Sequence, residues 1–357
     1  MQDISKIDKN FAINATVQKD GLCFYDVKNP PFRVYGLLFE GGKFRRMPEA
    51  IAANISDGVY RLHTCTAGGR VRFRTNSKRI AIQVKLARMG SGIQQPLLGS
   101  SGFDLYVGND HKKSFPPPAG TTDGYESVAE FLTAEDREIT IHFPLYCEVH
   151  DLLIGIDEGA ILGSASPYHT EKPIVFYGSS TFTRWDPSYG NVPLREVLLG
   201  KSGKPCCVNR GFGSSCSEHQ LYYYDRMIRP LEPKVLVYLG SGNYNSFGYT
   251  VEEAWELAQR VIMYALTDFP DIHVYIHGTK PIKDMSEDYI ERARKYDEMA
   301  KEFAENTPGC YFVSCMDYAP MLRDDIYIAD GVHNTPEGYE LYADFFREKL
   351  KDEFDRF

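Results

Sequence analysis

The strongest constraint on the fold of this chain is a change in its hydrophobic pattern about halfway along the sequence. From about residue 12 to residue 158, short runs of β-forming residues follow one another, separated by Gly, Pro, Asn and Asp. No good helical period appears among them. Many short strands without intervening helices are typical of a β-sandwich or jelly roll. We therefore predict an all-β domain of this type over residues 1–160.

The second half of the chain has a different pattern. After a connector rich in Gly, Ser and Pro, which we interpret as a linker at 161–172, apolar strands alternate with amphipathic segments. The predicted strands are 174–177, 235–240, 272–278 and 311–315. Helix starts are indicated by a capping box at Thr250 and Glu253 and by Pro336. This alternation predicts a parallel sheet covered by helices on both faces over residues 173–357, with ligands at the carboxyl ends of the strands.

The composition excludes several classes of protein. A length of 357 residues, with 43% hydrophobic and 25% charged residues, is sufficient for two domains with their own cores. The net charge of −9 argues against nucleic acid as a partner. No stretch approaches the ~20 apolar residues that span a bilayer, so we expect no membrane partner. A homo-oligomer is compatible with the sequence.

The cysteines and the N-terminus bear on the cellular location and on metal binding. The eight cysteines form no CxxC pair, which suits neither a zinc site nor a disulfide framework. The charged N-terminus contains no apolar segment of a secretory signal. We therefore expect a reduced, cytoplasmic protein without a metal or another cofactor. A secreted form from which the signal had been removed would have the same pattern.

Gly178-Ser179-Ser180 directly follows the first predicted strand of the second half. A hydroxyl at this place points into the crevice of an α/β sheet, and the following backbone N–H groups can stabilise an anion. Serines at strand-to-helix turns also serve as helix caps. This motif alone therefore allows both a nucleophile and a cap.

Asp330 and His333 are three residues apart, just before the last predicted helix. A histidine that accepts a serine proton needs a carboxylate on its other ring nitrogen to hold the tautomer. One short loop with Asp-x-x-His supplies both groups. The alternative is a capped turn, because Asp330-Gly331 is a good turn pair and Asn334 or Thr335 a good N-cap.

Two further turns, at 209–217 and 238–247, follow strands and are rich in small residues. Small residues let the backbone approach a ligand closely. Both segments could be plain turns between a strand and a helix. They could also supply the backbone N–H groups and the side-chain amide that stabilise the oxyanion in acyl transfer.

Together these four segments resemble the blocks of the SGNH (GDSL-like) hydrolase family, in the same order and over residues 173–352. The resemblance implies a flavodoxin-like three-layer fold and ester hydrolysis without a metal. It also implies that Ser180 is the nucleophile and that His333 and Asp330 complete a catalytic triad. The strand-rich first half is similar to the jelly-roll domain that precedes the catalytic domain in some carbohydrate O-acetyl esterases.

The family pattern assigns the oxyanion hole less directly. It implies the N–H groups of Ser180 and Ser214 and the side-chain amide of Asn243 as donors. In the second block the family has glycine where this chain has Ser214, so the donor is available only if the serine backbone can adopt the required conformation. In the third block the family has Gly-x-Asn-Asp. Alignment without a gap places Gly242 at the amide position, a shift of one residue places Asn243 there, and a larger shift Asn245.

The leading interpretation is a serine esterase that removes short acyl groups, acetate above all, from a small-molecule or oligosaccharide ester. One alternative is a carbohydrate-binding or scaffold protein that has lost activity through the changes in the second and third blocks. Another is an esterase or thioesterase for lipid acyl chains. The presence of Ser180, Asp330 and His333 favours the enzyme. We expect Cys216, near the second block, to be a small buried residue without a redox role.

Overall fold

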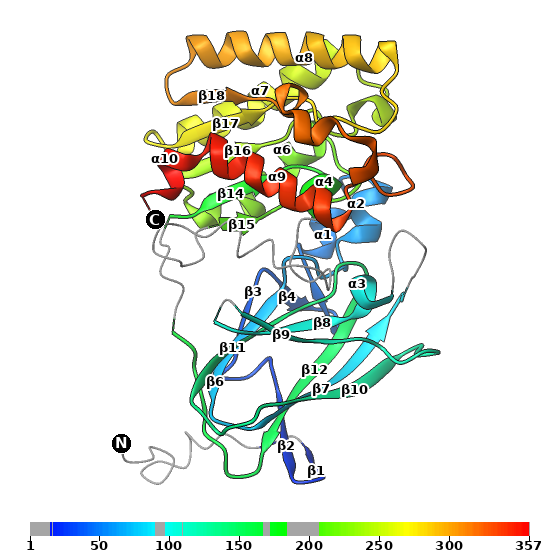
Figure 1. Ribbon diagram of the computed structural model, residues 1–357, viewed down its shortest axis with the longest axis vertical. Helices are drawn as coiled ribbons and strands as arrows, with labels where there is room; N and C mark the ends of the chain where they lie inside the picture. The colour runs from blue at the N-terminus through cyan, green and yellow to red at the C-terminus, as the bar shows by residue number, and fades with distance from the viewer. Residues whose placement is uncertain are drawn as a thin grey trace. The chain divides into compact units, whose positions relative to one another are not determined.

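The computed structural model describes residues 15, 17–89, 97–108, 110–166, 172–183 and 207–356. The chain divides into two compact units (Figure 1). The N-terminal unit comprises Met1–Arg46 and Thr64–Pro167, and the C-terminal unit comprises Met47–His63 and Tyr168–Phe357. The segment Met47–His63 belongs to the C-terminal unit, although in sequence it lies between strands of the N-terminal unit. The predicted division at residues 161–172 did not anticipate this.

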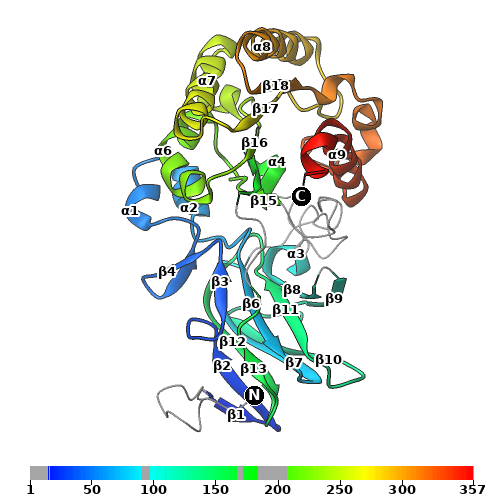
Figure 2. The ribbon, with the colours of Figure 1, turned by 90° about the vertical axis from the view of Figure 1, so that its left-hand side faces the viewer.

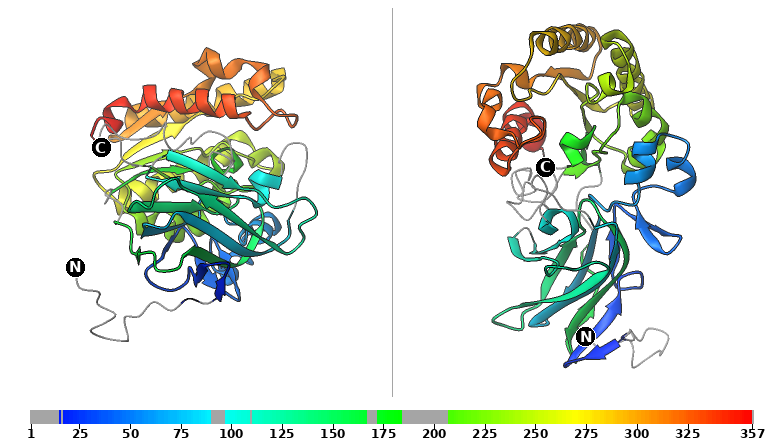
Figure 3. Two further views of the ribbon diagram at one scale, coloured as in Figure 1. Left: turned by 60° about the horizontal axis from the view of Figure 1, so that its bottom comes forward. Right: turned by 90° about the vertical axis from the view of Figure 1, so that its right-hand side faces the viewer.

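The N-terminal unit contains two antiparallel sheets (Figure 3). The strands of the first sheet, in spatial order, are β1 (Val17–Lys19), β2 (Leu22–Asp26), β12 (Glu148–Asp157), β7 (Arg79–Ala87) and β10 (Gly124–Glu130). Those of the second are β13 (Leu162–Gly163), β6 (Arg70–Thr75), β11 (Arg137–His142), β8 (Phe103–Val107) and β9 (Asp110–Phe115), with β3 (Arg33–Tyr35) paired to β6. A hairpin of β4 (Leu38–Glu40) and β5 (Lys43–Arg45) and the short helix α3 (Leu97–Ser101) complete this unit.

The core of the N-terminal unit lies between its two sheets. In the second sheet, Ile141 is opposite Val71, and in the first, Ile154 is opposite Ile82. All four side chains are fully buried in one hydrophobic cluster. Alternate residues of a strand point to opposite faces, so one apolar set from each sheet fills the interior. The predicted all-β N-terminal fold is confirmed.

The C-terminal unit is built on a parallel sheet of five strands. In spatial order these are β15 (Cys207–Asn209), β14 (Ile174–Tyr177), β16 (Val235–Tyr238), β17 (His273–His277) and β18 (Cys310–Val313). Four of the five agree with the predicted strands to within a few residues. The sequence analysis missed β15, which has only three residues and lies at an edge of the sheet.

Helices cover both faces of this sheet (Figure 2). On one face are α1 (Glu49–Ala52), α2 (Asp57–Leu62), α6 (Ser217–Met227), α7 (Val251–Asp268) and α8 (Glu287–Asn306). On the other are α4 (Ser180–Thr183), α9 (Pro336–Lys349) and α10 (Lys351–Phe354). The strands alternate between these two layers: Val175 of β14 packs in the first and Phe176 in the second. The predicted three-layer α/β fold is confirmed.

The predicted helix starts are also present. Thr250 and Glu253 form a reciprocal capping box at the start of α7. Pro336 is the first residue of α9, where its missing N–H group has no helical partner to lose. Among the described residues, no helix combines the length and the apolar character needed to cross a membrane.

Candidate active site

Ser180 is the first residue of α4 and lies just past the carboxyl end of β14. The turn between strand and helix is tight: a Cβ atom at Gly178 would lie 2.9 Å from the Leu239 Cβ. The carbonyl of Ser179 accepts the hydrogen bond of the Thr183 N–H, which begins the helix. Ser179 is buried, whereas Ser180 is only half-buried. This local geometry presents the Ser180 hydroxyl at the end of the strand.

His333 lies within hydrogen-bond distance of both Ser180 and Asp330, one through each ring nitrogen. The Ser180 Oγ is 2.8 Å from the His333 Nε2, and the His333 Nδ1 is 2.7 Å from Asp330 Oδ2. An ionised carboxylate only accepts hydrogen bonds, so Nδ1 carries the proton. Nε2 is then free to accept the serine proton. The structure thus brings the three predicted residues together in the arrangement of a serine–histidine–aspartate triad.

The second carboxylate oxygen of Asp330 holds the turn. Asp330 Oδ1 accepts hydrogen bonds from the backbone N–H groups of Val332 and His333, each at 2.9 Å. Burial raises the pKa of Asp330, but the hydrogen bonds from the His333 backbone and side chain and from Val332 outweigh it. The pKa of Asp330 is therefore held below its ordinary value of 3.8, which keeps the carboxylate charged. The capped turn considered as the alternative is therefore also formed: one oxygen of Asp330 accepts from the backbone of the turn, and the other contacts the His333 ring.

Gly213 and Ser214, in the second block, lie beside the nucleophile. A Cβ atom at Gly213 would be 3.7 Å from the Ser180 Cβ. Ser214 has a φ of 55°, in the left-handed region that glycine enters without strain. The Ser214 backbone therefore adopts a conformation that is open to serine but that glycine reaches more easily. An L-residue loses ~1–2 kcal/mol there.

Asn243 of the third block forms a hydrogen bond to the second block. Its Nδ2 donates to the carbonyl oxygen of Ser215 at 2.9 Å, and an amide nitrogen has a second hydrogen to donate. A Cβ atom at Gly242 would lie 2.6 Å from the Ser179 Oγ, so the glycine lets the third block approach the Gly-Ser-Ser turn. Asn245 is exposed and follows in a short 3-10 helix. The hydrogen bond of Asn243 to Ser215 favours the one-residue shift among the three alignments, although Asn245 also lines the pocket beside Ser180.

Helix α2 packs on the second block, which the sequence analysis did not anticipate. A Cβ atom at Gly58 would be 3.0 Å from the Ser214 Cβ, and one at Gly213 would be 3.2 Å from the Leu62 Cδ1. Val59 of the same helix is fully buried in one cluster with Phe212. The only signal in the sequence was the N-cap Ser56, whose Oγ accepts from the Val59 N–H.

Lys280 supports the loop that carries the acid and the base. It is 6% exposed, and its Nζ donates to the carbonyl oxygens of Val332 at 2.9 Å and Pro281 at 3.0 Å. The ammonium group also lies 4.6 Å from the centre of the Tyr327 ring. Burial lowers the pKa of Lys280 to about 7, although the nearby Cys315 and Asp330 oppose this change. Sequence analysis missed Lys280 because nothing in a sequence marks a lysine in a loop as buried.

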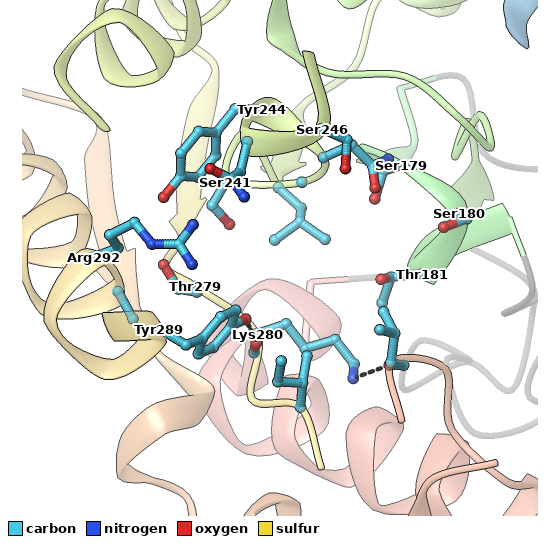
Figure 4. A pocket seen from close by; sticks show the side chains of 17 residues that line it. Ser179, Ser180, Thr181, Ser241, Tyr244, Ser246, Thr279, Lys280, Tyr289 and Arg292 are labelled. Carbon is cyan, nitrogen blue, oxygen red and sulfur yellow. Dashed lines mark hydrogen bonds between the residues drawn. The ribbon is translucent and has the colours of Figure 1, made fainter. Parts of the chain in front are cut away.

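A pocket of about 220 Å³ adjoins Ser180 (Figure 4). Its walls are the Gly-Ser-Ser turn, the loop after β16, the loop after β17 and the start of α8. The lining residues are Ser179, Ser180, Thr181, Leu239, Ser241, Gly242, Asn243, Tyr244, Asn245, Ser246, Thr279, Lys280, Ile282, Tyr289, Arg292, Ala293 and Val332. The predicted nucleophile therefore opens into a concave site within the C-terminal unit.

One cluster of potential metal ligands exists among the described residues. Atoms of Cys216, Glu218 and His219 lie within 4.8 Å of one another. However, the His219 Nδ1 accepts the Cys216 N–H at 3.2 Å, and Glu218 accepts the Tyr249 hydroxyl at 2.6 Å. The contact between His219 and Cys216 thus serves the cap of α6, and Glu218 already has a hydrogen-bond partner in Tyr249. Cys216 is 1% exposed, and burial raises the pKa of its thiol, as suits a small structural residue.

A family model matches the N-terminal half of the chain. Residues 22–162 match the family model described as GxDLY, the N-terminus of Esterase_SGNH_hydro-type. The pattern in that description is present as Gly102-Phe103-Asp104-Leu105-Tyr106, at the start of β8. A search of curated proteins finds no match to this sequence.

Solved structures share the fold over almost the whole chain. A protein described as a GDSL-like lipase from Bacteroides ovatus ATCC 8483 is 18% identical, with a TM-score of 0.72 over 93% of this chain and 97% of that chain. The salicylyl-acyltransferase SsfX3 from a tetracycline biosynthetic pathway is 17% identical, with a TM-score of 0.71 over 94% and 98%. A family two carbohydrate esterase from Clostridium thermocellum, in complex with cellohexaose, is 13% identical, with a TM-score of 0.54 over 89% and 99%. The two-domain SGNH-type architecture predicted from the sequence is confirmed.

Proposed function

We propose that this chain, a carboxylic ester hydrolase of the two-domain SGNH type, removes short acyl groups from carbohydrate through Ser180, His333 and Asp330. The observation that carries the proposal is the unbroken chain of two hydrogen bonds from Ser180 through His333 to Asp330, at 2.8 Å and 2.7 Å. Ser180, at one end of these two hydrogen bonds, lines a pocket beside the second and third blocks. Such an arrangement activates a hydroxyl for attack on a carbonyl carbon.

In the acylation half of the reaction, the Ser180 Oγ attacks the ester carbonyl and forms a C–O bond. His333 Nε2 takes the hydroxyl proton, and the Asp330 carboxylate stabilises the resulting imidazolium. The negative charge on the former carbonyl oxygen is stabilised by the N–H groups of Ser180 and Ser214 and by the Asn243 amide. When the tetrahedral intermediate collapses, His333 returns the proton to the leaving alcohol, and the acyl group remains on Ser180.

In the second half, a water molecule replaces the alcohol. His333 removes a proton from the water as it attacks the acyl carbonyl, and the same oxyanion donors stabilise the second tetrahedral intermediate. Its collapse releases the carboxylic acid, and the proton returns to the Ser180 Oγ. No metal or other cofactor takes part in either half of this scheme.

The saccharide assignment is supported by the likeness to a carbohydrate esterase that was solved with cellohexaose. The size of the pocket, about 220 Å³, supports a short acyl group over a long acyl chain. Its lining combines serine, threonine and asparagine side chains with the apolar side chains of Leu239, Ile282, Ala293 and Val332. A long lipid chain would need a continuous apolar surface. The lipid esterase or thioesterase remains the second interpretation, and the experiment below separates the two.

The alternative of a binding protein without activity is less well supported by the geometry. Its premise was that the second and third blocks no longer provide oxyanion donors. Instead, Ser214 adopts the backbone conformation of a glycine and Asn243 is tied to the adjacent Ser215. Both features agree with a functional oxyanion hole.

The test is a hydrolysis screen of p-nitrophenyl esters from acetate to palmitate, run beside acetylated oligosaccharides. We expect acetate release from the oligosaccharides to exceed hydrolysis of octanoyl and longer esters at matched concentration. Ser180→Ala should abolish turnover, whereas its neighbour Ser179→Ala should remain active. A preference for long acyl chains would remove the short-acyl assignment. Normal activity of Ser180→Ala would remove the proposed nucleophile.

A further inference from the structure

The charged side chains that line the pocket beside Ser180 are basic, although the whole protein is acidic. The chain carries a net charge of −9, yet the pocket lining includes Arg292 and Lys280 and no aspartate or glutamate. Cationic groups around a concave site concentrate field lines and attract anions. The two basic side chains of the pocket, Arg292 and Lys280, therefore suit an anionic ligand.

Arg292 lies on α8, across the pocket from Ser180 in the view of Figure 4. One edge of its guanidinium is occupied, because Nε and Nη2 contact the Asp288 carboxylate at 2.9 Å and 2.8 Å. The Asp288 side chain is 77% exposed and that of Arg292 is 28% exposed. An ion pair with so exposed a carboxylate is screened by water and is weak. It orients the guanidinium without removing its ability to bind a second anion.

Tyr244 connects Arg292 to the rest of the pocket. Burial raises the pKa of Tyr244, and the charge and hydrogen bond of Arg292 act against that rise. Tyr244 directly follows the proposed oxyanion residue Asn243 in the chain, so the cation is linked to the third block. A ligand group held by Arg292 would thus extend into the same pocket onto which the nucleophile opens.

Lys280 adds positive charge to the same pocket from a deeper position. Its Nζ binds two backbone carbonyls, of Pro281 and Val332, so it contributes charge rather than a free hydrogen-bond partner. Because burial lowers its pKa to about 7, an anion in the pocket would favour its charged form. Because binding of an anion and protonation of Lys280 favour each other, the preference of the pocket for anionic ligands increases.

We propose that this pocket binds a carboxylate-bearing part of the ester substrate, with Arg292 as the residue that contacts it. The proposal rests on the proposed esterase function and narrows its substrate class. The planar guanidinium pairs two N–H groups with the two oxygens of a carboxylate, which a lysine cannot do in the same geometry. The carboxylate can come from the acyl side, as in a half-ester of a dicarboxylic acid, or from the alcohol side, as in an acetylated uronic acid.

The kinetic experiment uses pairs of esters that differ in one charged group. For the acyl side, 4-nitrophenyl butyrate is compared with the mono-4-nitrophenyl ester of succinic acid, which has the same number of acyl carbons. For the alcohol side, an acetylated neutral oligosaccharide is compared with an acetylated oligogalacturonide. We expect a lower KM for the carboxylate in one of these pairs, and the pair that shows it identifies the source.

Substitution of Arg292 then tests the contact itself. Arg292→Gln should raise the KM of the carboxylate substrate ~10- to 100-fold more than that of its neutral partner, the range expected for a hydrogen bond between charged groups. Arg294→Gln is the matched control: Arg294 is on the same helix, is 56% exposed and pairs with Glu291 and Glu298. It does not line the pocket, so this variant should keep the KM ratio of the wild type.

A binding measurement separates this proposal from the esterase function. In the Ser180→Ala protein, which cannot form an acyl-enzyme, succinate and galacturonate are titrated by calorimetry. We expect one of them to bind, and to bind more weakly after Arg292→Gln. The proposal is overturned if neither binds and neither kinetic pair shows a preference for the carboxylate, even when the neutral esters are hydrolysed. If no ester is hydrolysed but a carboxylate still binds at Arg292, the esterase function fails and the anion site stands.

Discussion

Gly58 of α2 lies so close to Ser214 that a Cβ atom on the glycine would be 3.0 Å from the serine Cβ. Few real Cβ contacts are this short, so a side chain at residue 58 would require the second block to shift by a few tenths of an ångström. Ser214 has a left-handed backbone and provides a proposed oxyanion donor. A helix from the first half of the sequence thus contacts the turn on which catalysis is proposed to depend.

We predict that Ser214→Gly retains most of the kcat and does not destabilise the protein. The donor is a backbone N–H, which glycine keeps, and the left-handed conformation costs glycine nothing. The strain removed, ~1–2 kcal/mol, is offset in part by ~0.5–1 kcal/mol of extra chain entropy lost on folding. Ser214→Ala, which retains the strain, is the control. Urea unfolding and kcat measurements check both, and a large loss of kcat in the glycine variant alone would show that the hydroxyl itself takes part.

A second prediction concerns the contact between α2 and this turn. Gly58→Ala should lower kcat and change KM less, because the new methyl group displaces the Ser214 backbone that is proposed to stabilise the transition state. Ser214→Gly should restore part of the loss when combined with Gly58→Ala, since it removes the atom that the methyl group meets. The wild type, the two single variants and the double variant form a double-mutant cycle. We expect kcat of the double variant to be higher than the product of the two single effects predicts.

Gly163→Ala is the matched control for this cycle, because a Cβ atom at Gly163 would meet nothing within 4 Å. It should leave kcat at the wild-type value. Purely additive effects of Gly58→Ala and Ser214→Gly would contradict the proposed contact, as would normal turnover in Gly58→Ala.

The general fold and the candidate residues Ser180, Asp330 and His333 could be predicted because each stands in a recognisable local pattern. Buried strands alternating with helices are visible as hydrophobic periodicity, and Asp330 and His333 are close in the chain. Helix α2 was missed because six residues give less than two turns of periodicity, and its apolar residues look like those of the neighbouring strands. The conformation of Ser214 could not be predicted either, because the helix that packs against it, α2, is distant in sequence.

We predict that the stability cost of burying Lys280 depends on pH. The pKa of Lys280 is about 7 in the folded protein against an ordinary value of 10.5, so between these values the unfolded chain binds the additional proton. Lys280 therefore destabilises the fold fully below about pH 7, and this cost decreases as the pH rises toward 10.5.

Lys280→Met removes this titration and keeps a side chain of similar length. The difference in unfolding free energy between Lys280→Met and the wild type should thus be largest near pH 6 and should shrink toward pH 10, as measured by denaturant unfolding at several pH values. The variant should also have a reduced kcat, because it loses the two hydrogen bonds to the Pro281 and Val332 carbonyls. A pH-independent difference would show that the lysine is not buried with a lowered pKa.

The last prediction separates the two tasks of Asp330. Asp330→Asn keeps an oxygen that can accept the Val332 and His333 N–H groups, so the turn should survive and stability at pH 7 should fall less than in Asp330→Ala. The amide has no charge with which to stabilise the His333 imidazolium, and it can donate to Nδ1 and so favour the wrong tautomer. We therefore expect kcat of Asp330→Asn to fall by up to ~10⁴-fold.

Comparison with two other variants completes this test. His333→Ala should be nearly inactive. Asp330→Ala should be less severely affected, because without a partner at residue 330 the His333 imidazole can still adopt the tautomer with the proton on Nδ1. The pKa of Asp330 is lowered in the folded protein, so the wild type should also lose the stability contributed by this carboxylate as the pH falls below 3.8, a loss that Asp330→Asn would not show. If Asp330→Asn turned over at the wild-type rate with an intact fold, the carboxylate would serve only the turn, and the proton relay through His333 would need another partner.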